Sequence, residues 1–159
     1  EELEAVDNYI YILNVRFAGD IHFSKKVECD VENVRVPSMI LQPVVENAVN
    51  HGIRNIDWEG HIDLSVEKWN DHIEISVRDN GLGMTGEQIQ RVLSKKVHSS
   101  SGEGDSTGIG MNNVISRLEL YYERDGLMEI YSEGEGMGTE VVINIPLERS
   151  EKNVQNPDC

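Results

Sequence analysis

Apolar residues along the chain alternate between helical and strand-like spacing, and this pattern predicts the elements. Residues 3–17 carry apolar side chains every three to four positions, which predicts an amphipathic opening helix that ends near Gly19. Its narrow stripe would suit packing against a neighbouring helix. Residues 36–53, VPSMILQPVVENAVNHGI, predict a second helix, with Ser38 at the N-cap and Gly52 near the C-terminal end. The opening stripe comprises Leu3, Val6, Ile10, Leu13 and Phe17.

Alternation of apolar and polar residues predicts the strands. Residues 21–28 read as a short strand, and the segments 62–67 and 73–78, joined through WNDH, read as an antiparallel hairpin with one buried face. Residues 126–133 and 138–147 predict a closing hairpin around EGEGMGT.

Two further helices and two polar segments complete the pattern. Residues 85–95 predict a short helix, and residues 97–108, VHSSSGEGDSTG, have the small and polar composition of a mobile loop. A longer helix follows, and after Pro146 the chain has little apolar content and is expected to fray. The buried face of the longer helix is predicted to carry Val114, Ile115, Leu118 and Tyr121.

Composition limits the classes of function. A chain of 159 residues with 38% hydrophobic content suits one domain, and 14 basic against 29 acidic residues give a net charge of −15. This charge repels nucleic acids and anionic lipids, so neither is expected as a partner. Cys29 and Cys159 fit no disulfide framework or metal site and favour a reducing cytoplasm. The absence of a long apolar run predicts a soluble piece, and the start at EELEAV, without methionine, suggests a fragment.

The stretch RDNGLGM aims a carboxylate toward the core. The apolar residues of strand 72–79 face inward, so period-two geometry puts Asp79 on the same side. A buried, ionised carboxylate needs a donor, and the exocyclic amine of adenine would supply one. Gly81 and Gly83 would let a flat base approach the backbone. The alternative is a tight turn in which Asp79 accepts backbone amides and the glycines supply positive φ.

A polar face on the second helix suggests a cation site. Pro43, Asn47, Asn50 and His51 cluster at helical spacing, and an asparagine oxygen there could bind a Mg²⁺ held chiefly by phosphates. Glu46 flanks this face and could orient a water. The alternative is a solvated helix face.

The third candidate is GIGMNN, residues 108–113, where two glycines open a helix. Free amides at a helix start, with the helix dipole, can hold an anion. Acidic composition therefore does not exclude a nucleotide, because backbone amides and Mg²⁺ can hold polyphosphate without a basic patch. The alternative is an ordinary helix-start turn.

Four motifs occur in order, namely ENAVNHG, DNGLGM, GIGM and GMGTEVVINIPL. They resemble the N, G1, G2 and terminal glycine–threonine boxes of the family that unites gyrase B, Hsp90, sensor histidine kinases and MutL. Within that family, EELEAVDNYIYILNVRF together with VPSMILQPVVENAVNHGI is similar to LytS/YesM-type bacterial sensor histidine kinases. The resemblance covers roughly residues 1–148.

The resemblance implies a fold and a division of the chain. The expected fold is a two-layer α/β (α+β) sandwich of Bergerat type, with a mixed, mostly antiparallel sheet covered on one face by three helices. Residues 1–18 would be a helix leading to a dimerisation and phosphoacceptor region, and residues 19–148 the ATP-binding domain. Residues 95–107 would form a mobile ATP lid, and residues 149–159 a disordered tail.

The resemblance also implies a set of ATP-binding residues. Asn47 would be the Mg²⁺ ligand, Asp79 the adenine reader, and Thr139 a support for Asp79 or for a water. Many relatives carry a basic residue where Asn50 stands, so Lys95, Lys96 or Arg54 would take over a phosphate contact here. Met84 is expected to pack at the base of the lid. The implied ATP contacts are Asn47, Asn50, His51, Asp79, Gly81, Gly83, Met84, Gly108, Ile109, Gly110, Met111 and Thr139.

One absence indicates phosphoryl transfer rather than hydrolysis. Hydrolysing relatives carry a glutamate base four residues before the metal-binding asparagine, where this chain has Pro43. Glu46, a tentative catalytic residue, lies about 100° from Asn47 around a helix and is a weaker base. The acceptor histidine of the family, in an H-F-x-x-N-like helix, is missing, since HFSKK at His22 lacks the asparagine. The isolated chain is therefore expected to bind ATP·Mg²⁺ with almost no autophosphorylation.

The implied partners are an upstream phosphoacceptor domain and a response regulator, in a dimeric, membrane-anchored parent whose isolated fragment is monomeric. The stripe on residues 3–17 would meet the upstream helices. Two alternatives stay open: a degenerate module that binds a nucleotide or partner without transfer, and a stand-alone ATPase or anti-sigma-type serine kinase of the same superfamily.

Overall fold

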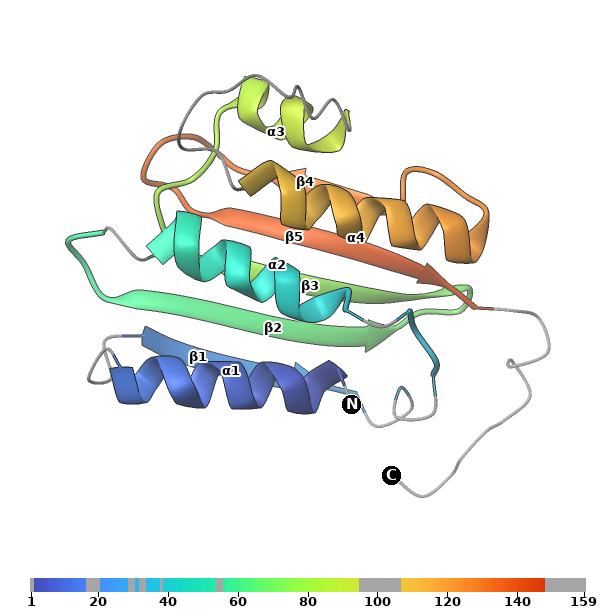
Figure 1. The fold of residues 1–159 in the computed structure, drawn as a ribbon, viewed down its shortest axis with the longest axis horizontal. Coiled ribbons are helices and arrows are strands. Elements are labelled where there is room, and N and C mark those ends of the chain that lie inside the picture. Colours follow the sequence, from blue (N-terminus) through green and yellow to red (C-terminus); the bar gives the residue numbers. More distant parts are fainter. Residues whose placement is uncertain are drawn as a thin grey trace.

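A five-stranded sheet with helices over one face forms the domain (Figure 1). The computed structural model describes residues 2–16, 21–28, 31, 34–37, 39–53, 56–94 and 107–147. The expected tail and the expected lid up to residue 106 lie outside these ranges.

The sheet is mixed, as the sequence predicts, and its strand order is β1-β2-β3-β5-β4. β1 pairs in parallel with β2, whereas β2–β3, β3–β5 and β5–β4 are antiparallel. The two strands of the predicted closing hairpin are shorter than the ranges 126–133 and 138–147 that the alternation predicts. The strands are β1 (Ile21–Val27), β2 (Gly60–Lys68), β3 (His72–Asp79), β4 (Met128–Tyr131) and β5 (Thr139–Pro146).

The second predicted helix is a composite. It begins as α2 (Leu41–Asn47) and continues as a π-helix, η2 (Ala48–Ile53), so Gly52 lies near its end as predicted. Ile40 occupies the N-cap position and makes no side-chain cap bond, while Ser38 is not among the described residues. The other helices are α1 (Glu2–Arg16), α3 (Gly86–Leu93) and α4 (Thr107–Tyr122).

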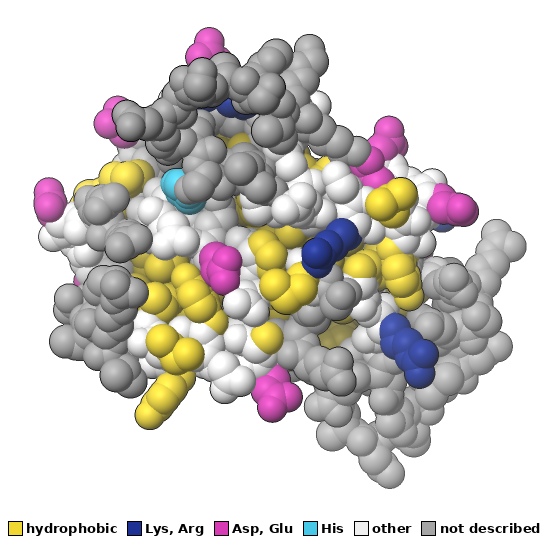
Figure 2. All heavy atoms as spheres, in the orientation of Figure 1, with side chains coloured by type: hydrophobic (Ala, Val, Ile, Leu, Met, Phe, Trp, Pro, Cys, Tyr) yellow, Lys and Arg dark blue, Asp and Glu magenta, His cyan; other side chains and the backbone are white. Residues whose placement is uncertain are grey.

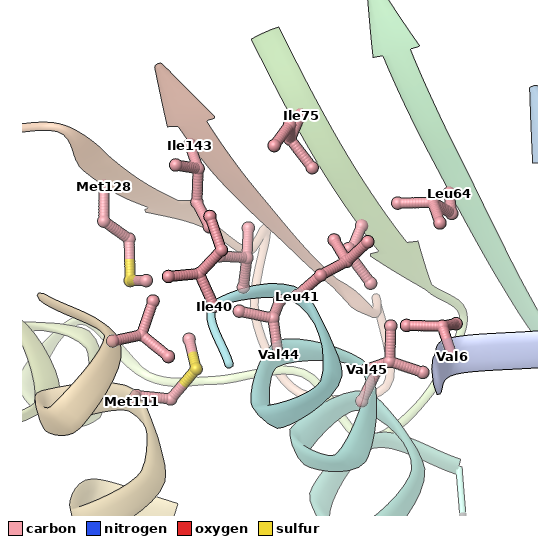
Figure 3. Close-up of a cluster of buried hydrophobic side chains, with 14 of the residues drawn as sticks. Val6, Ile40, Leu41, Val44, Val45, Leu64, Ile75, Met111, Met128 and Ile143 are labelled. Carbon is pink, nitrogen blue, oxygen red and sulfur yellow. The ribbon is translucent and has the colours of Figure 1, made fainter. Parts of the chain in front are cut away.

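The core lies between the sheet and the helices. The inward residues of β2 and β3 are buried, as the alternation predicts, and α2 packs over them. Figure 3 shows Ile40 near Ile143 and Met111, on the α4 side of α2, and Val45 next to Val6 of α1. The helix α2 therefore has α1 on one flank and α4 on the other, a position that fixes its polar residues relative to both.

The stripe of α1 belongs to this core, which corrects the expectation that it meets upstream helices. Val6, Ile10 and Leu13 are only 0%, 6% and 9% exposed, and α1 packs against α2 and β1. The parallel edge of the sheet needs a cover over its helix-facing side, and α1 supplies it (Figure 1).

The buried face of α4 also needs a correction at its last turn. Val114, Ile115 and Leu118 are buried as predicted, but Tyr121 is 56% exposed. Tyr122, four residues after Leu118, is the tyrosine that packs against the core, because four residues complete about one turn of the helix.

Within the described ranges, none of the helices is long and apolar enough to span a membrane.

We predict that Ile10→Ala lowers the free energy of unfolding by about 2–4 kcal/mol, because it leaves a cavity between α1 and α2. The matched control is Ile12→Ala on the same helix, where a 63% exposed side chain should cost less than about 0.5 kcal/mol. Urea unfolding followed by circular dichroism measures both. Equal losses in the two variants would show that α1 is not part of the core.

Candidate functional site

The motifs that the sequence separates come to one end of the molecule. The end of β3, the start of β5, the end of η2 and the start of α4 all lie on the left in Figure 1. The segments around Asp79 and Thr139 therefore lie at the same end of the sheet as the segments around Gly52 and Gly108.

Asp79 points inward, as predicted, and is 6% exposed. Its Oδ1 accepts a hydrogen bond from the backbone amide of Gly81 at 2.9 Å, and the amide of Thr139, its register partner on β5, also donates to the carboxylate. Burial raises the pKa of Asp79 to about 6, and the two backbone hydrogen bonds only partly offset this effect. The turn contact considered as the alternative is thus formed, yet it leaves the carboxylate poorly compensated.

Gly81 and Gly83 allow two close backbone contacts. A Cβ at Gly81 would lie 1.9 Å from the carbonyl oxygen of Gly52, and one at Gly83, which has φ +77°, would lie 2.1 Å from the carbonyl oxygen of Gly134. The amide of Leu82 donates to the oxygen of Gly52 at 2.8 Å. Gly81 therefore packs the turn directly onto η2, and Gly83 packs it onto the turn between β4 and β5. Their contact with an adenine stays a prediction.

Gly52 is a site residue that the sequence reading missed, since it was considered only as a helix end. A Cβ at this position would lie 2.7 Å from Oδ1 of Asp79. Only a hydrogen atom fits between the η2 backbone and the carboxylate. The signal available in the sequence was a glycine at the end of the same apolar helix that carries Asn47 and His51.

Asn47 lies at the junction of α2 and η2 and carries an unsatisfied group. Its Oδ1 is fully buried and has no hydrogen-bond partner. Asn47 shares a helix face with Val44 and Ile40, three and seven residues earlier, and Ile40 lies toward Met111 of α4 (Figure 3). The orphaned oxygen is therefore on the flank of α2 that faces α4. A buried acceptor without a donor is costly and suits a cation ligand.

The other polar residues of this helix differ in their surroundings. Asn50 is exposed, whereas His51 is half-buried and already interacts with another group of the protein. Oε1 of Glu46 accepts a hydrogen bond from Nε2 of Gln42 at 2.9 Å, which holds it along the surface of α2. Its proposed role in orienting a water stays a prediction.

The glycines of GIGM lie inside the first turn of α4, which begins at Thr107. The amide of Gly108, the second helical residue, precedes the first helical hydrogen bonds, whereas Gly110, the fourth, is at the position whose amide makes the first i→i−4 bond of an α-helix. The side chain of Met111 is buried in the core, so only its backbone can meet a ligand. The side chain of Ile109 is not described, and Arg54, Lys95 and Lys96 fall in the segments that the structure leaves undescribed.

The sequence analysis predicted no role for two further asparagines, Asn80 and Asn112. Asn80 anchors the start of β2, because its Oδ1 accepts from the amide of His61 at 2.7 Å and its Nδ2 donates to the oxygen of Glu59 at 2.8 Å. Asn112 of α4 is buried, and its Oδ1 has no hydrogen-bond partner. Asn80 directly follows Asp79 and Asn112 directly follows Met111, so the signal in the sequence was a position next to a predicted site residue.

The charge distribution matches a ligand held without a basic patch. Figure 2 shows acidic side chains around the rim of the helix-covered face and basic side chains only in scattered positions. No cluster of three or more histidine, cysteine, aspartate or glutamate side chains in the described segments could hold a metal. A Mg²⁺ that keeps its waters and binds phosphates needs no such cluster.

Comparison with known proteins identifies the class. Residues 35–149 match the family described as histidine kinase-, DNA gyrase B-, and HSP90-like ATPase, and the chain belongs to this family. Membership implies ATP binding, and the α/β sandwich agrees with it.

The individual proteins to which the chain is similar are sensor kinases. The sensor protein LytS of Staphylococcus saprophyticus is 28% identical over 160 residues, which cover 100% of this chain and 26% of that protein. The sensor histidine kinase YpdA of Escherichia coli is 31% identical, with 94% of this chain and 24% of that protein covered. The chain thus spans about a quarter of the length of these relatives.

Solved structures share the fold. The catalytic domain of histidine kinase ThkA superposes with a TM-score of 0.63 at 18% identity, covering 91% of this chain and 94% of that one. The mycobacterial sensor histidine kinase MprB gives 0.62 at 20% identity, covering 91% and 93%.

We predict that the Asp79 carboxyl makes folding less favourable as the pH rises from about 4 to about 6. The folded state keeps the proton up to about pH 6, whereas the unfolded chain releases it near 3.8. Above that range the ionised group costs about 2–3 kcal/mol. Asp79→Asn should therefore gain stability relative to wild type across this window.

Urea unfolding at several pH values gives the difference between the two proteins. Asp57→Asn, at an exposed position, controls for the loss of a surface charge. A difference curve that is flat between pH 4 and 6 would contradict the raised pKa.

We predict that Gly52→Ala pushes the Asp79 carboxylate out of place and destabilises the fold by about 1–3 kcal/mol. Gly86→Ala is the control, because a Cβ at Gly86 meets nothing within 4 Å. Thermal unfolding measures both. A loss at Gly52 no larger than that at Gly86 would show that the close contact has room to relax.

Proposed function

We propose that this chain is the ATP·Mg²⁺-binding catalytic domain of a two-component sensor histidine kinase. It presents the γ-phosphoryl group of ATP to a histidine in an upstream domain, from which the phosphoryl group passes to a response regulator. The match to the family and to sensor kinases along nearly the whole chain supports this proposal.

The observation that carries the proposal is the buried carboxylate of Asp79. Its pKa of about 6 leaves it mostly ionised at neutral pH, in a place where burial penalises the charge. An adenine amine can donate to this carboxylate and compensate for lost hydration, which backbone amides alone do not achieve. Gly81 and Gly83 let the backbone segments around Asp79 pack closely, which fixes the position of the carboxylate that the adenine would meet.

Asn47 and the start of α4 account for the rest of the nucleotide. The buried Oδ1 of Asn47 has no donor in the protein and would be satisfied as a ligand of Mg²⁺. The ion, when bound, neutralises charge on the phosphates. The free amides in the first turn of α4, including that of Gly108, would hold the phosphates without basic side chains, and the missing side chain at Gly110 would leave open space beside them.

Transfer is favoured over hydrolysis. Pro43 occupies the position one turn before Asn47, and a proline has no group that can activate water. Glu46 is hydrogen-bonded to Gln42 on another flank of α2. Phosphoryl transfer needs mainly alignment and charge neutralisation, so the nucleophile can come from a different domain.

The wider assembly follows from the same proposal. The upstream domain would dimerise and carry the acceptor histidine, and the parent protein would be anchored in the cell membrane with this domain on the cytoplasmic side. The response regulator would meet the phosphorylated histidine rather than this domain.

We predict that calorimetric titration detects ATP binding that Mg²⁺ strengthens. Asp79→Asn should lower ATP affinity about tenfold or more, because a charge-assisted hydrogen bond is lost. Asn47→Ala should remove the strengthening by Mg²⁺ and change binding without Mg²⁺ much less. The matched control is Asn70→Ala, at an exposed asparagine between β2 and β3.

Four outcomes would reject parts of the assignment. Unchanged ATP affinity in Asp79→Asn rejects the adenine contact, and an intact Mg²⁺ effect in Asn47→Ala rejects the metal ligand. Binding without transfer from γ-labelled ATP to the parent's phosphoacceptor domain, supplied separately, favours the degenerate module. A stable phosphohistidine on this chain alone would contradict the need for an upstream acceptor.

A further inference from the structure

Two glycine-rich turns interlock beside Asp79. The amide of Gly136 donates to the oxygen of Leu82 at 2.7 Å, and the amide of Gly138 donates to the oxygen of Gly81 at 3.1 Å. The fit is tight, since a Cβ at Gly138 would lie 2.2 Å from the backbone oxygen of Asp79. The turn after β3 and the turn between β4 and β5 therefore form one unit.

The hydroxyl of Ser132 ties this unit together. It donates to the oxygen of Gly138 at 2.7 Å and accepts from the amides of Met84 at 3.0 Å and Gly134 at 3.4 Å. A serine hydroxyl has one donor and two acceptor positions, and all three are used. All three bonds go to backbone groups of the two turns, and this fixes the position of the half-buried hydroxyl.

The partners of Ser132 belong to two turns, Gly134 and Gly138 to the turn between β4 and β5 and Met84 to the turn after β3. Gly138 immediately precedes Thr139, whose amide donates to the Asp79 carboxylate. Met84 immediately precedes Thr85, which caps α3 through a reciprocal pair of hydrogen bonds with Gln88. The hydroxyl thus sets the distance between the segment that holds Asp79 and the segment that starts α3.

We propose that Ser132 is a positioning residue for the nucleotide site, whose hydroxyl holds the Asp79–Thr139 pair and the Gly81–Met84 turn in the register that nucleotide binding requires. This inference rests on the proposed function. Ser132 does not act on the nucleotide directly; it acts through the backbone of Gly138 and Met84.

The backbone hydrogen bonds between the turns do not make the hydroxyl redundant. They join Gly81 to Gly138 and Leu82 to Gly136, before Met84 is reached. Removing the hydroxyl would leave the Met84 amide without this partner and release the end of the turn next to α3. The expected loss is therefore in the geometry of the site, with the fold kept.

The test compares Ser132→Ala, Ser132→Thr and wild type by calorimetric titration with ATP and with adenosine, well below the unfolding temperature. Ser132→Ala should weaken both ligands about tenfold, because three hydrogen bonds that fix the site are lost. Ser132→Thr keeps the hydroxyl and should stay within about twofold of wild type. The matched control is Ser76→Ala, which removes a half-buried hydroxyl bonded to Glu140 on β5 and should leave both affinities unchanged.

The outcomes separate this inference from the proposed function. If wild type binds ATP and Ser132→Ala binds it equally well, the positioning role is rejected and the proposed function stands. Equal losses in Ser132→Ala and Ser132→Thr also reject it, because shape rather than the hydroxyl would then matter. If wild type fails to bind ATP, the proposed function fails and this inference fails with it.

Discussion

The close approach of the η2 backbone to the Asp79 carboxylate is the constraint on which the rest of the site depends. A carboxylate in the core normally meets a positive side chain, but here it meets Gly52, Gly81 and the amide of Thr139. Backbone amides hold the group in place without neutralising it. The protein thereby keeps a charged acceptor buried at the end of the central strand β3, and in the proposed function the adenine of ATP compensates it.

The same principle explains how an acidic chain can bind a polyanion. With a net charge of −15, long-range electrostatics oppose any nucleotide. In the proposed function the attractive groups are short-range and uncharged, namely helix-start amides in α4 and the buried oxygen of Asn47, which would act through a cation. Such groups discriminate by geometry, which makes the positions of turns and helix ends more important than surface charge.

Periodicity was sufficient for most of the fold and for the inward orientation of Asp79, because burial of alternate residues leaves a direct trace in the sequence. It failed for α1, whose stripe looked available for another domain but fills the core. It also failed at Tyr121, where a helix end decides which of two neighbouring tyrosines is buried. Gly52 and Ser132 act through backbone groups of distant segments, and no local pattern records such contacts.

The π-helical turn explains why Asn47 and Gly52 can serve one site. In an α-helix, residues five apart point in directions about 140° different, so Asn47 facing α4 would turn Gly52 away from it. A π-turn closes its hydrogen bonds between residues five apart, so such residues return to nearly the same side. The segment Ala48–Ile53 is π-helical. Straightening it into an α-helix would turn Asn47 away from the glycine that packs against Asp79, although neither residue had changed.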